Sequence, residues 1–266
     1  MSRLIESTLR RFARALSDAL ISEQIATRRG LLQSLDARVR VLALFALVLA
    51  VLLSRRILII AALLAVAALL ALASRVSLGL LAKRVWLVAL GFTGIIAIPA
   101  LFITPGPPLG KFASMTSTGL RSAILLITRV ETAATLTTLL VLTTPWNYLL
   151  KALRELKLPA EVVTVLAMTH RYIFLLIESA NQMFESRQSR MVGVLSSAEQ
   201  RRMTARTAGV LLSKSIELSQ DVYLAMQSRG FRGEVHALAG SRMTAHDFAA
   251  LALAILAATA AVWIGR

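Results

Sequence analysis

The stretch LVLTTPWNYLLKALRELKLPAE, residues 140–161, marks the point where this chain changes character. A long apolar block ends at the Thr-Thr-Pro triplet 143–145, which combines capping hydroxyls with a proline and so indicates a helix start. We expect a short amphipathic helix from Trp146 to Leu156, ended by the Lys-Leu-Pro triplet 157–159. The sequence therefore predicts an all-α protein in which membrane-spanning helices are followed by a long, charged helical segment.

The composition supports a polytopic membrane protein. Of the 266 residues, 57% are hydrophobic and only 17% are charged, whereas soluble domains carry about 45–50% and about 25%. The net charge of +16 is explained better by cytoplasmic loops than by nucleic acid, so no nucleic-acid partner is expected. The chain has no cysteine, which excludes disulfides and thiolate metal sites.

Five blocks are apolar enough to cross a bilayer. The first two are short, so we expect a tight helical hairpin whose flanking arginines, Arg38, Arg40, Arg55 and Arg56, snorkel to the two surfaces. The blocks lie at Val39–Leu53, Ile57–Ala73, Val85–Ile103, Gly119–Leu142 and Asp247–Ile264.

The blocks divide the chain into four expected regions. They are an amphipathic, juxtamembrane segment at 1–38, four spans within 39–143, a cytoplasmic helical segment at 144–245 and a last span at 246–266. The N-terminal stretch MSRLIESTLRRFARALSDAL has no uninterrupted apolar core and no small-residue cleavage site, so it is not expected to be a secretory signal. A cytoplasmic N-terminus places most lysines and arginines inside, as the positive-inside rule prefers, and places the C-terminus outside. The expected location is the cell's inner, cytoplasmic membrane.

The fourth block carries Arg129 and Glu131. Ionisable residues within a span are candidates for function. A structural role is the stronger interpretation, because each side chain can pair with a neighbouring helix. The two side chains do not face each other, since they lie two residues apart on a helix.

The charged segment predicts two long helices. Residues 160–192 contain neither proline nor glycine, and Gly193 and Gly230 supply stop signals. Apolar residues recur at alternating spacings of four and three, which is typical of helices that pack on one another. The packing positions include Val162, Leu166, Ile173, Leu176, Met183, Leu211, Leu218 and Val222.

Each apolar stripe continues into arginine. Arg187 and Arg190 extend the first, and Arg229 extends the second. One terminal arginine can be explained by the helix dipole. Two in the same register favour a docking device, because the planar guanidinium can bind carboxylates or carbonyls of a partner.

The segments LTTPWNYLLKALRELKLP, MTHRYIFLLIESANQMFESRQSRMVG and YLAMQSRGFRGE resemble the cytoplasmic half of the transmembrane (T) component of energy-coupling-factor (ECF) transporters, best its cobalt/nickel branch. LDARVRVLAL resembles the family's opening signature. The resemblance implies an L-shaped helical protein that has no catalytic residues, cofactor or metal site of its own. Two ATP-binding-cassette ATPase subunits bind the ATP, and a separate membrane subunit holds the substrate.

By this resemblance, a short Ala-Arg-Gly-type motif ends each long helix and enters a groove of one ATPase. The first motif is Ser189-Arg190-Met191, with Arg187 as a fallback register, and the second is Ser228-Arg229-Gly230. Serine replaces alanine in both motifs, and methionine replaces glycine in the first. Cobalt or nickel is the expected substrate, and a vitamin such as biotin is the alternative.

Two other classes of protein compete with this interpretation. A membrane enzyme could use His170, Glu178 and Glu185, which recur on a similar face of one long helix, although no His-Glu-x-x-His motif is present. A self-contained channel or carrier is a further alternative, but no pair of spans shows matched glycine or proline breaks.

Overall fold

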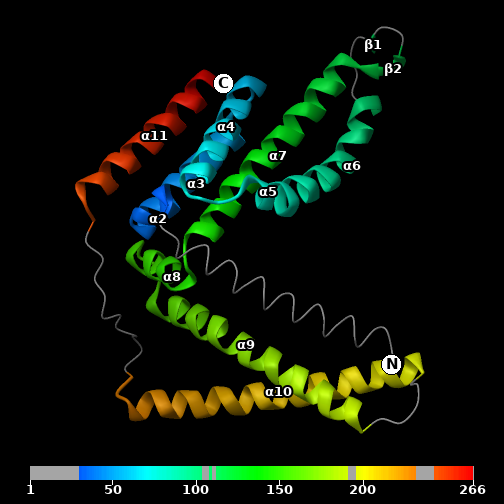
Figure 1. Ribbon diagram of the computed structural model, residues 1–266, viewed down its shortest axis with the longest axis vertical. Coiled ribbons are helices and arrows are strands. Elements are labelled where there is room, and N and C mark those ends of the chain that lie inside the picture. The colour runs from blue at the N-terminus through cyan, green and yellow to red at the C-terminus, as the bar shows by residue number, and fades with distance from the viewer. Residues whose placement is uncertain (1–29, 104–107, 110–111, 191–195, 232–242, 266) are drawn as a thin grey trace. The chain divides into compact units, whose positions relative to one another are not determined.

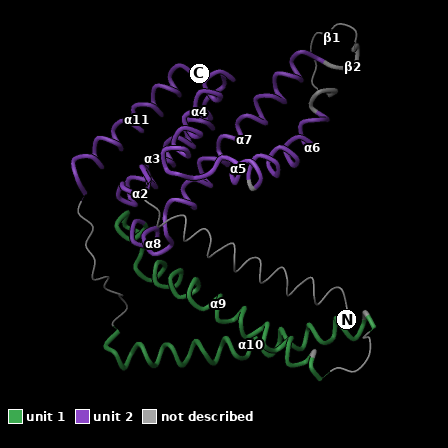
Figure 2. Tube along the Cα trace, in the orientation of Figure 1, with its two compact units in different colours: residues 1–21, 153–240 green, residues 22–152, 241–266 purple. Residues whose placement is uncertain are grey.

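The computed structural model describes residues 30–103, 108–109, 112–190, 196–231 and 243–265 (Figure 1). The described chain divides into two compact units, coloured separately in Figure 2. We call residues 30–152 with 243–265 the apolar unit, and residues 153–231 the crossed-helix unit. The division falls inside a short helix, later than the boundary expected after residue 143.

The apolar unit is helical except for one short hairpin. Its helices are α2 (Leu31–Ser34), α3 (Ala37–Leu53), α4 (Ile57–Ala73), α5 (Leu78–Leu81), a π-helical turn η1 (Ala82–Trp86), α6 (Leu87–Ile103), α7 (Ser117–Thr143), the first part of α8 (Trp146–Glu155) and α11 (Ala245–Gly265). Strands β1 (Pro108–Leu109) and β2 (Phe112–Thr116) pair antiparallel between α6 and α7. The crossed-helix unit contains α9 (Ala160–Ser189) and α10 (Ser197–Ser228). The all-α fold class is confirmed.

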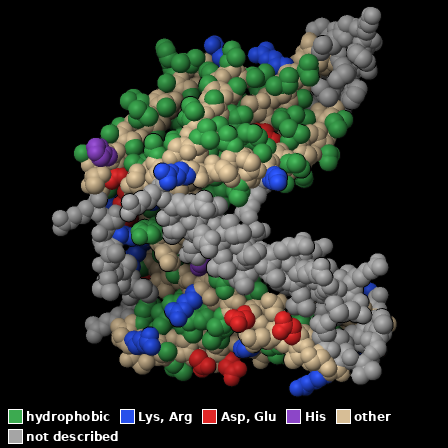
Figure 3. Space-filling model, viewed as in Figure 1, with side chains coloured by type: hydrophobic (Ala, Val, Ile, Leu, Met, Phe, Trp, Pro, Cys, Tyr) green, Lys and Arg blue, Asp and Glu red, His purple; other side chains and the backbone are tan. Residues whose placement is uncertain are grey.

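Helix α7 is central in the apolar unit, where α3, α4 and α6 pack against it and α11 packs against α3. The core between them mixes leucine with small residues such as Ala50, Ala67 and Ala258. Apolar side chains are spread over the whole visible surface of these helices, with few charged ones among them (Figure 3). Because lipid tails are as apolar as leucine, close packing across small residues holds such helices together.

Helices α3 and α11 run parallel and are joined at both ends. At one end the backbone N–H of Asp36 donates to Asp247 Oδ1 (2.8 Å). At the other, the N–H of Arg55 donates to the carbonyl of Gly265 (2.8 Å). The predicted order of crossings requires this relation, because the first and fifth spans of such a protein point the same way.

The expected third span begins earlier than the sequence indicated. Helical structure starts at Leu78 and continues through the π-helical turn Ala82–Trp86 into α6. The sequence did not predict this earlier start because Lys83, a charged residue, interrupts the apolar run. In the structure Trp86 Nε1 donates to Thr135 Oγ1 of α7 (3.1 Å), so the turn is fixed to the central helix.

The expected hairpin of α3 and α4 differs in its packing. Both helices pack mainly on other helices, α3 on α11 and α7, and α4 on α7. Arg55 and Arg56 are exposed at the turn, as expected for snorkelling side chains. Arg40 is not: it is only 5% exposed and donates to backbone carbonyls. The expectation that Arg40 snorkels is therefore wrong, because internal acceptors replace the membrane surface.

Helices α9 and α10 run antiparallel and cross. Lys214 Nζ donates to Ser179 Oγ (3.1 Å), and Ser179, Ala180 and Thr207 are buried near this contact. The start of α10 is fixed by a capping box, in which Ser196 and Glu199 exchange hydrogen bonds. The backbone N–H and the hydroxyl of Ser196 both bind the Glu199 carboxylate and lower its pKa.

By length and composition, the described part of the chain has three helices able to span a membrane, α7, α9 and α11. Helices α4 and α6 are apolar but shorter. Helix α9 belongs to the segment that was expected to stay outside the bilayer.

Candidate functional site

The end of α10 is a Schellman motif built around Gly230. Its N–H donates to the carbonyl of Gln227 (2.9 Å), and the N–H of Phe231 donates to the carbonyl of Met226 (3.0 Å). Gly230 has φ of 81°, a conformation that glycine adopts without strain. The predicted stop signal is confirmed at this helix.

The second predicted arginine motif lies on this turn. Arg229 is the C-cap of α10, and its side chain is exposed. The Ser228 hydroxyl donates back to the carbonyl of Ala225 (2.9 Å), so it is satisfied within the helix. The guanidinium is thus presented to the surroundings from an ordered backbone.

The end of α9 has a similar arrangement. Ser189 is its last residue, and the Ser189 hydroxyl donates back to the carbonyl of Glu185 (3.0 Å). Arg190 follows the helix, its N–H donates to the carbonyl of Arg187 (3.2 Å), and its side chain is exposed. Met191 and the expected stop Gly193 lie outside the described residues.

The fallback residue Arg187 has a different environment. It is half-buried, and its Nη1 donates to the carbonyl of Met203 on α10 (3.4 Å). Arg190 makes no side-chain bond within the part of the chain that the structure describes. Of the two candidates, Arg190 is the one left available to a partner.

The predicted packing stripe does not form one continuous interface. Val162 and Ile173 are 45% and 48% exposed. The remaining positions are half-buried, namely Leu166, Leu176, Met183, Leu211, Leu218 and Val222. Because the helices cross, Ala180 and Thr207 are buried near the crossing, and the stripes diverge on either side of a groove.

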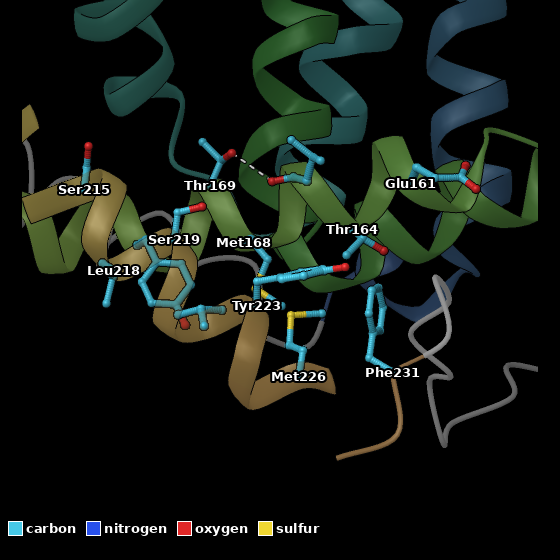
Figure 4. Close-up of a pocket in the computed structure, with 13 residues that line it drawn as sticks. Glu161, Thr164, Met168, Thr169, Ser215, Leu218, Ser219, Tyr223, Met226 and Phe231 are labelled. Atoms are coloured by element: carbon cyan, nitrogen blue, oxygen red, sulfur yellow. Dashed lines mark hydrogen bonds between the residues drawn. The ribbon is translucent and has the colours of Figure 1, made fainter. Parts of the chain in front are cut away.

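A groove of about 540 Å³ lies between the diverging helices, in the first half of α9 and the last part of α10. Aromatic and sulfur-containing side chains converge on it in Figure 4. They include Met168, Tyr172, Tyr223, Met226 and Phe231. Thr169 lies at its edge and donates back to the carbonyl of Val165 (2.8 Å). The sequence pattern did not predict this groove, although the methionines at 168 and 226 were a signal, since flexible thioethers line adaptable binding surfaces.

Comparison with known proteins identifies the family. The family model of the cobalt transport protein CbiQ matches residues 29–237. The chain belongs to the CbiQ family. It is thus an ECF transporter T component of the cobalt/nickel type, as the sequence motifs predicted.

The chain is also similar to individual relatives, two of which have names that agree with this assignment. An uncharacterized protein of Methanocaldococcus jannaschii is 31% identical over 96% of this chain and 90% of its own. The nickel permease LarQ of Lactiplantibacillus plantarum is 27% identical over 67% of this chain and 58% of its own. The ECF transporter transmembrane protein EcfT of Bacillus subtilis is 25% identical over 82% of this chain and 87% of its own.

The two charged residues within a span of this CbiQ-family chain, Arg129 and Glu131, differ in their hydrogen bonding. Arg129 Nη2 donates to the carbonyl of Ser54 at the end of α3 (2.6 Å), so it does bind a neighbouring helix. Glu131 is only 8% exposed, and neither carboxyl oxygen has a hydrogen-bond partner among the described residues. The expectation that Glu131 pairs with a neighbouring helix is therefore not met.

The residues that could have supported an enzyme, His170, Glu178 and Glu185, all lie on α9. His170 packs edge-to-face on Phe174, with ring centroids 5.2 Å apart, while Glu178 and Glu185 are exposed. Among the described residues, no group of three histidine, aspartate or glutamate side chains could hold a metal ion. The CbiQ family consists of membrane components of transporters, which is the class that the motifs indicated.

Proposed function

We propose that this chain transmits ATP-driven movement of two ATP-binding-cassette ATPases to a separate substrate-binding membrane subunit, in an importer of cobalt or nickel. One observation carries the proposal. Arg190 and Arg229 each follow directly on the end of a long, ordered helix and are exposed. Arg187, in contrast, donates a hydrogen bond to the carbonyl of Met203. The family and its nickel permease relative support the metal.

Each arginine is suited to bind in an ATPase groove. Its planar guanidinium can donate to several oxygens at once and keeps its charge at any physiological pH. The C-terminal turn from which it projects is held by backbone bonds, above all at Gly230. A push on the guanidinium is therefore passed to the helix rather than absorbed by a loose turn.

The groove between α9 and α10 is the proposed contact for the substrate-binding subunit. Its lining is predominantly apolar, and the exposed face of α9 beside it carries Val162, Val165 and Ile173. Helix α9 is hydrophobic enough to be a span by composition. An apolar helix of a membrane subunit matches such a surface better than a soluble partner does.

A parity argument supports placing α9 outside the bilayer core. Thr143 and Asp247 both contact the start of α3, so the chain leaves and re-enters the apolar unit at the same end. The intervening segment must then cross the membrane an even number of times. Of its described helices only α9 has the hydropathy of a span, and α10 does not. We propose that both lie on the cytoplasmic side of the cytoplasmic membrane, with the N-terminus.

Purification of the complex tests the proposal. The tagged chain, purified from the membranes of its own organism, is expected to copurify with two ATPase subunits and one further membrane protein. Proteoliposomes of that complex are expected to take up Co²⁺ or Ni²⁺ only with ATP. Recovery of the chain alone, with ATP-independent metal flux, would support a self-contained carrier and overturn the proposal.

A further inference from the structure

The two ends of segment 153–240 join the apolar unit at points that both contact the start of α3. Residues 153–240 are joined to it through α8 and the end of α7 on one side, and through the start of α11 on the other. Each of these points is hydrogen-bonded to the first turn of α3 or to its N-cap, Asp36.

The α11 side is held by Asp247, which is only 4% exposed. One of its carboxyl oxygens accepts from the backbone N–H of Asp36 (2.8 Å). The other accepts from the N–H and the hydroxyl of Thr244 (both 2.8 Å). Asp36 in turn caps α3 by accepting from the N–H of Arg38 (2.9 Å).

The α7 side is held by Arg40. Its Nη1 donates to the carbonyl of Thr143 and reaches the hydroxyl of Thr144 (3.5 Å), while its Nε donates to the carbonyl of Leu35 (3.1 Å). Thr143 and Thr144 are the last residues before α8, and both are buried. The buried guanidinium therefore joins the segment before α3 to the point where α7 becomes α8.

We infer that Asp36, Arg40 and Asp247 form a transmission anchor, through which movement of α9 and α10 reaches the membrane helices. The inference rests on the proposed function. A displacement of α9 and α10 passes along the chain to Thr143–Thr144 on one side and to Thr244–Asp247 on the other, because segment 153–240 continues into the apolar unit at these two points. Thr143–Thr144 and Asp247 are hydrogen-bonded to Arg40 and Asp36 at the start of α3. Displacement of either end of segment 153–240 therefore moves α3 together with α11 and α7.

Lysine is the informative replacement for Arg40. It keeps the charge and most of the length, but a single ammonium cannot follow the geometry of the guanidinium fork, which serves Leu35 and Thr143 together. The matched control is Arg55→Lys, the same change at the opposite end of α3, where the side chain is exposed. Asp247→Asn loosens the other side of the anchor without removing bulk.

The first measurement uses the complete complex in proteoliposomes. Arg40→Lys and Asp247→Asn are expected to copurify with the ATPases and to hydrolyse ATP, yet to import about tenfold less metal per ATP, as for the loss of a strong charged hydrogen bond. Arg55→Lys should keep the wild-type ratio. A residue with a structural role only would lower ATP hydrolysis and metal uptake in proportion, so that the metal imported per ATP stays at the wild-type value. An unchanged ratio of uptake to hydrolysis therefore overturns the anchor.

The second measurement needs no partner. In the isolated protein, amide hydrogens of the first turn of α8 are expected to exchange about tenfold faster in Arg40→Lys than in wild type or Arg55→Lys. Equal exchange overturns the anchor whether or not the chain binds ATPases. If exchange is faster in Arg40→Lys but the wild-type protein recruits no ATPases, the result counts against the proposed function alone. Should Arg40→Lys fail to fold, Thr144→Val, which retains Arg40 and its carbonyl contacts, is measured in the same way.

Discussion

The guanidinium of Arg187 donates to the carbonyl of Met203 on the neighbouring helix, at 3.4 Å. Three residues later Arg190 lies beyond the end of α9 and is exposed. One arginine of this pair stabilises the crossing of α9 and α10, and the other remains available to a partner. Substitution can therefore separate the two roles.

Arg190→Ala and Arg229→Ala are each expected to weaken ATPase binding. Loss of an arginine buried in an interface typically costs about 2 kcal/mol or more, roughly a thirtyfold loss of affinity. The double variant should lose its ATPases during purification, and lysine should rescue poorly because it lacks the planar fork.

Arg187→Ala is the matched control. It should retain the ATPases while lowering thermal stability slightly, since it removes one half-buried hydrogen bond. If Arg187→Ala releases the ATPases and Arg190→Ala does not, the fallback register is the right one. Normal transport by the Arg190/Arg229 double variant would contradict the docking role altogether.

Gly209, inside α10, and Gly230, just beyond its end, should respond oppositely to alanine. At either position a Cβ meets nothing within 4 Å, so only the backbone decides. Gly230 has φ of 81°, where alanine costs about 1 kcal/mol. Gly209 lies inside the helix, where alanine stabilises by about 0.5–1 kcal/mol.

Thermal unfolding and ATPase copurification measure these two variants. Gly230→Ala is expected to lower both the stability and the ATPase occupancy, because the turn that orients Arg229 is strained. Gly209→Ala should raise stability and leave occupancy unchanged. A Gly230→Ala protein with wild-type occupancy would show that the ordered turn does not matter for docking.

Several elements of the fold were predictable from the sequence. The bounds of α3, α4, α7 and α11 agree with the expected spans within two residues, because apolar composition alone defines a membrane helix. The stop at Gly230 was equally readable, because glycine alone adopts its conformation without strain. The exposure of Arg190 and Arg229 follows from their position just after a helix end.

Other features depend on contacts that one sequence does not reveal. Snorkelling predicted an exposed Arg40, but the carbonyls of Leu35 and Thr143 form an internal site for it. The apolar stripes of α9 and α10 have the period of a long helix pair, yet periodicity does not fix the crossing angle. Since the helices diverge, part of each stripe lines a groove instead of a core.

The orientation in the membrane can be measured with single cysteines, because the chain has none of its own. A cysteine at Arg56, between α3 and α4, should react with an impermeant reagent from outside intact cells. A cysteine at Lys157, after α8, should react only after permeabilisation, since positive charge favours the cytoplasmic side. Labelling of both positions from the same side would contradict the proposed crossings.

Glu131 offers a test of whether an unpartnered intramembrane carboxyl is structural or functional. Both its oxygens are buried without a hydrogen-bond partner in the described part of the chain. A buried polar group left unsatisfied costs about 1–3 kcal/mol, so Glu131→Leu is expected to stabilise the protein by a similar amount. Glu178→Leu, at an exposed position of α9, is the control and should change stability little.

Metal uptake by the reconstituted complex decides what that stabilisation means. If Glu131 has a structural role only, the Glu131→Leu complex should unfold at a higher temperature and transport at the wild-type rate. A more stable complex that no longer transports would instead assign the carboxyl to function, since sites that work by strain or charge are commonly retained at a cost in stability. A destabilised Glu131→Leu protein would mean that the carboxyl has a stabilising partner, against the environment found on α7.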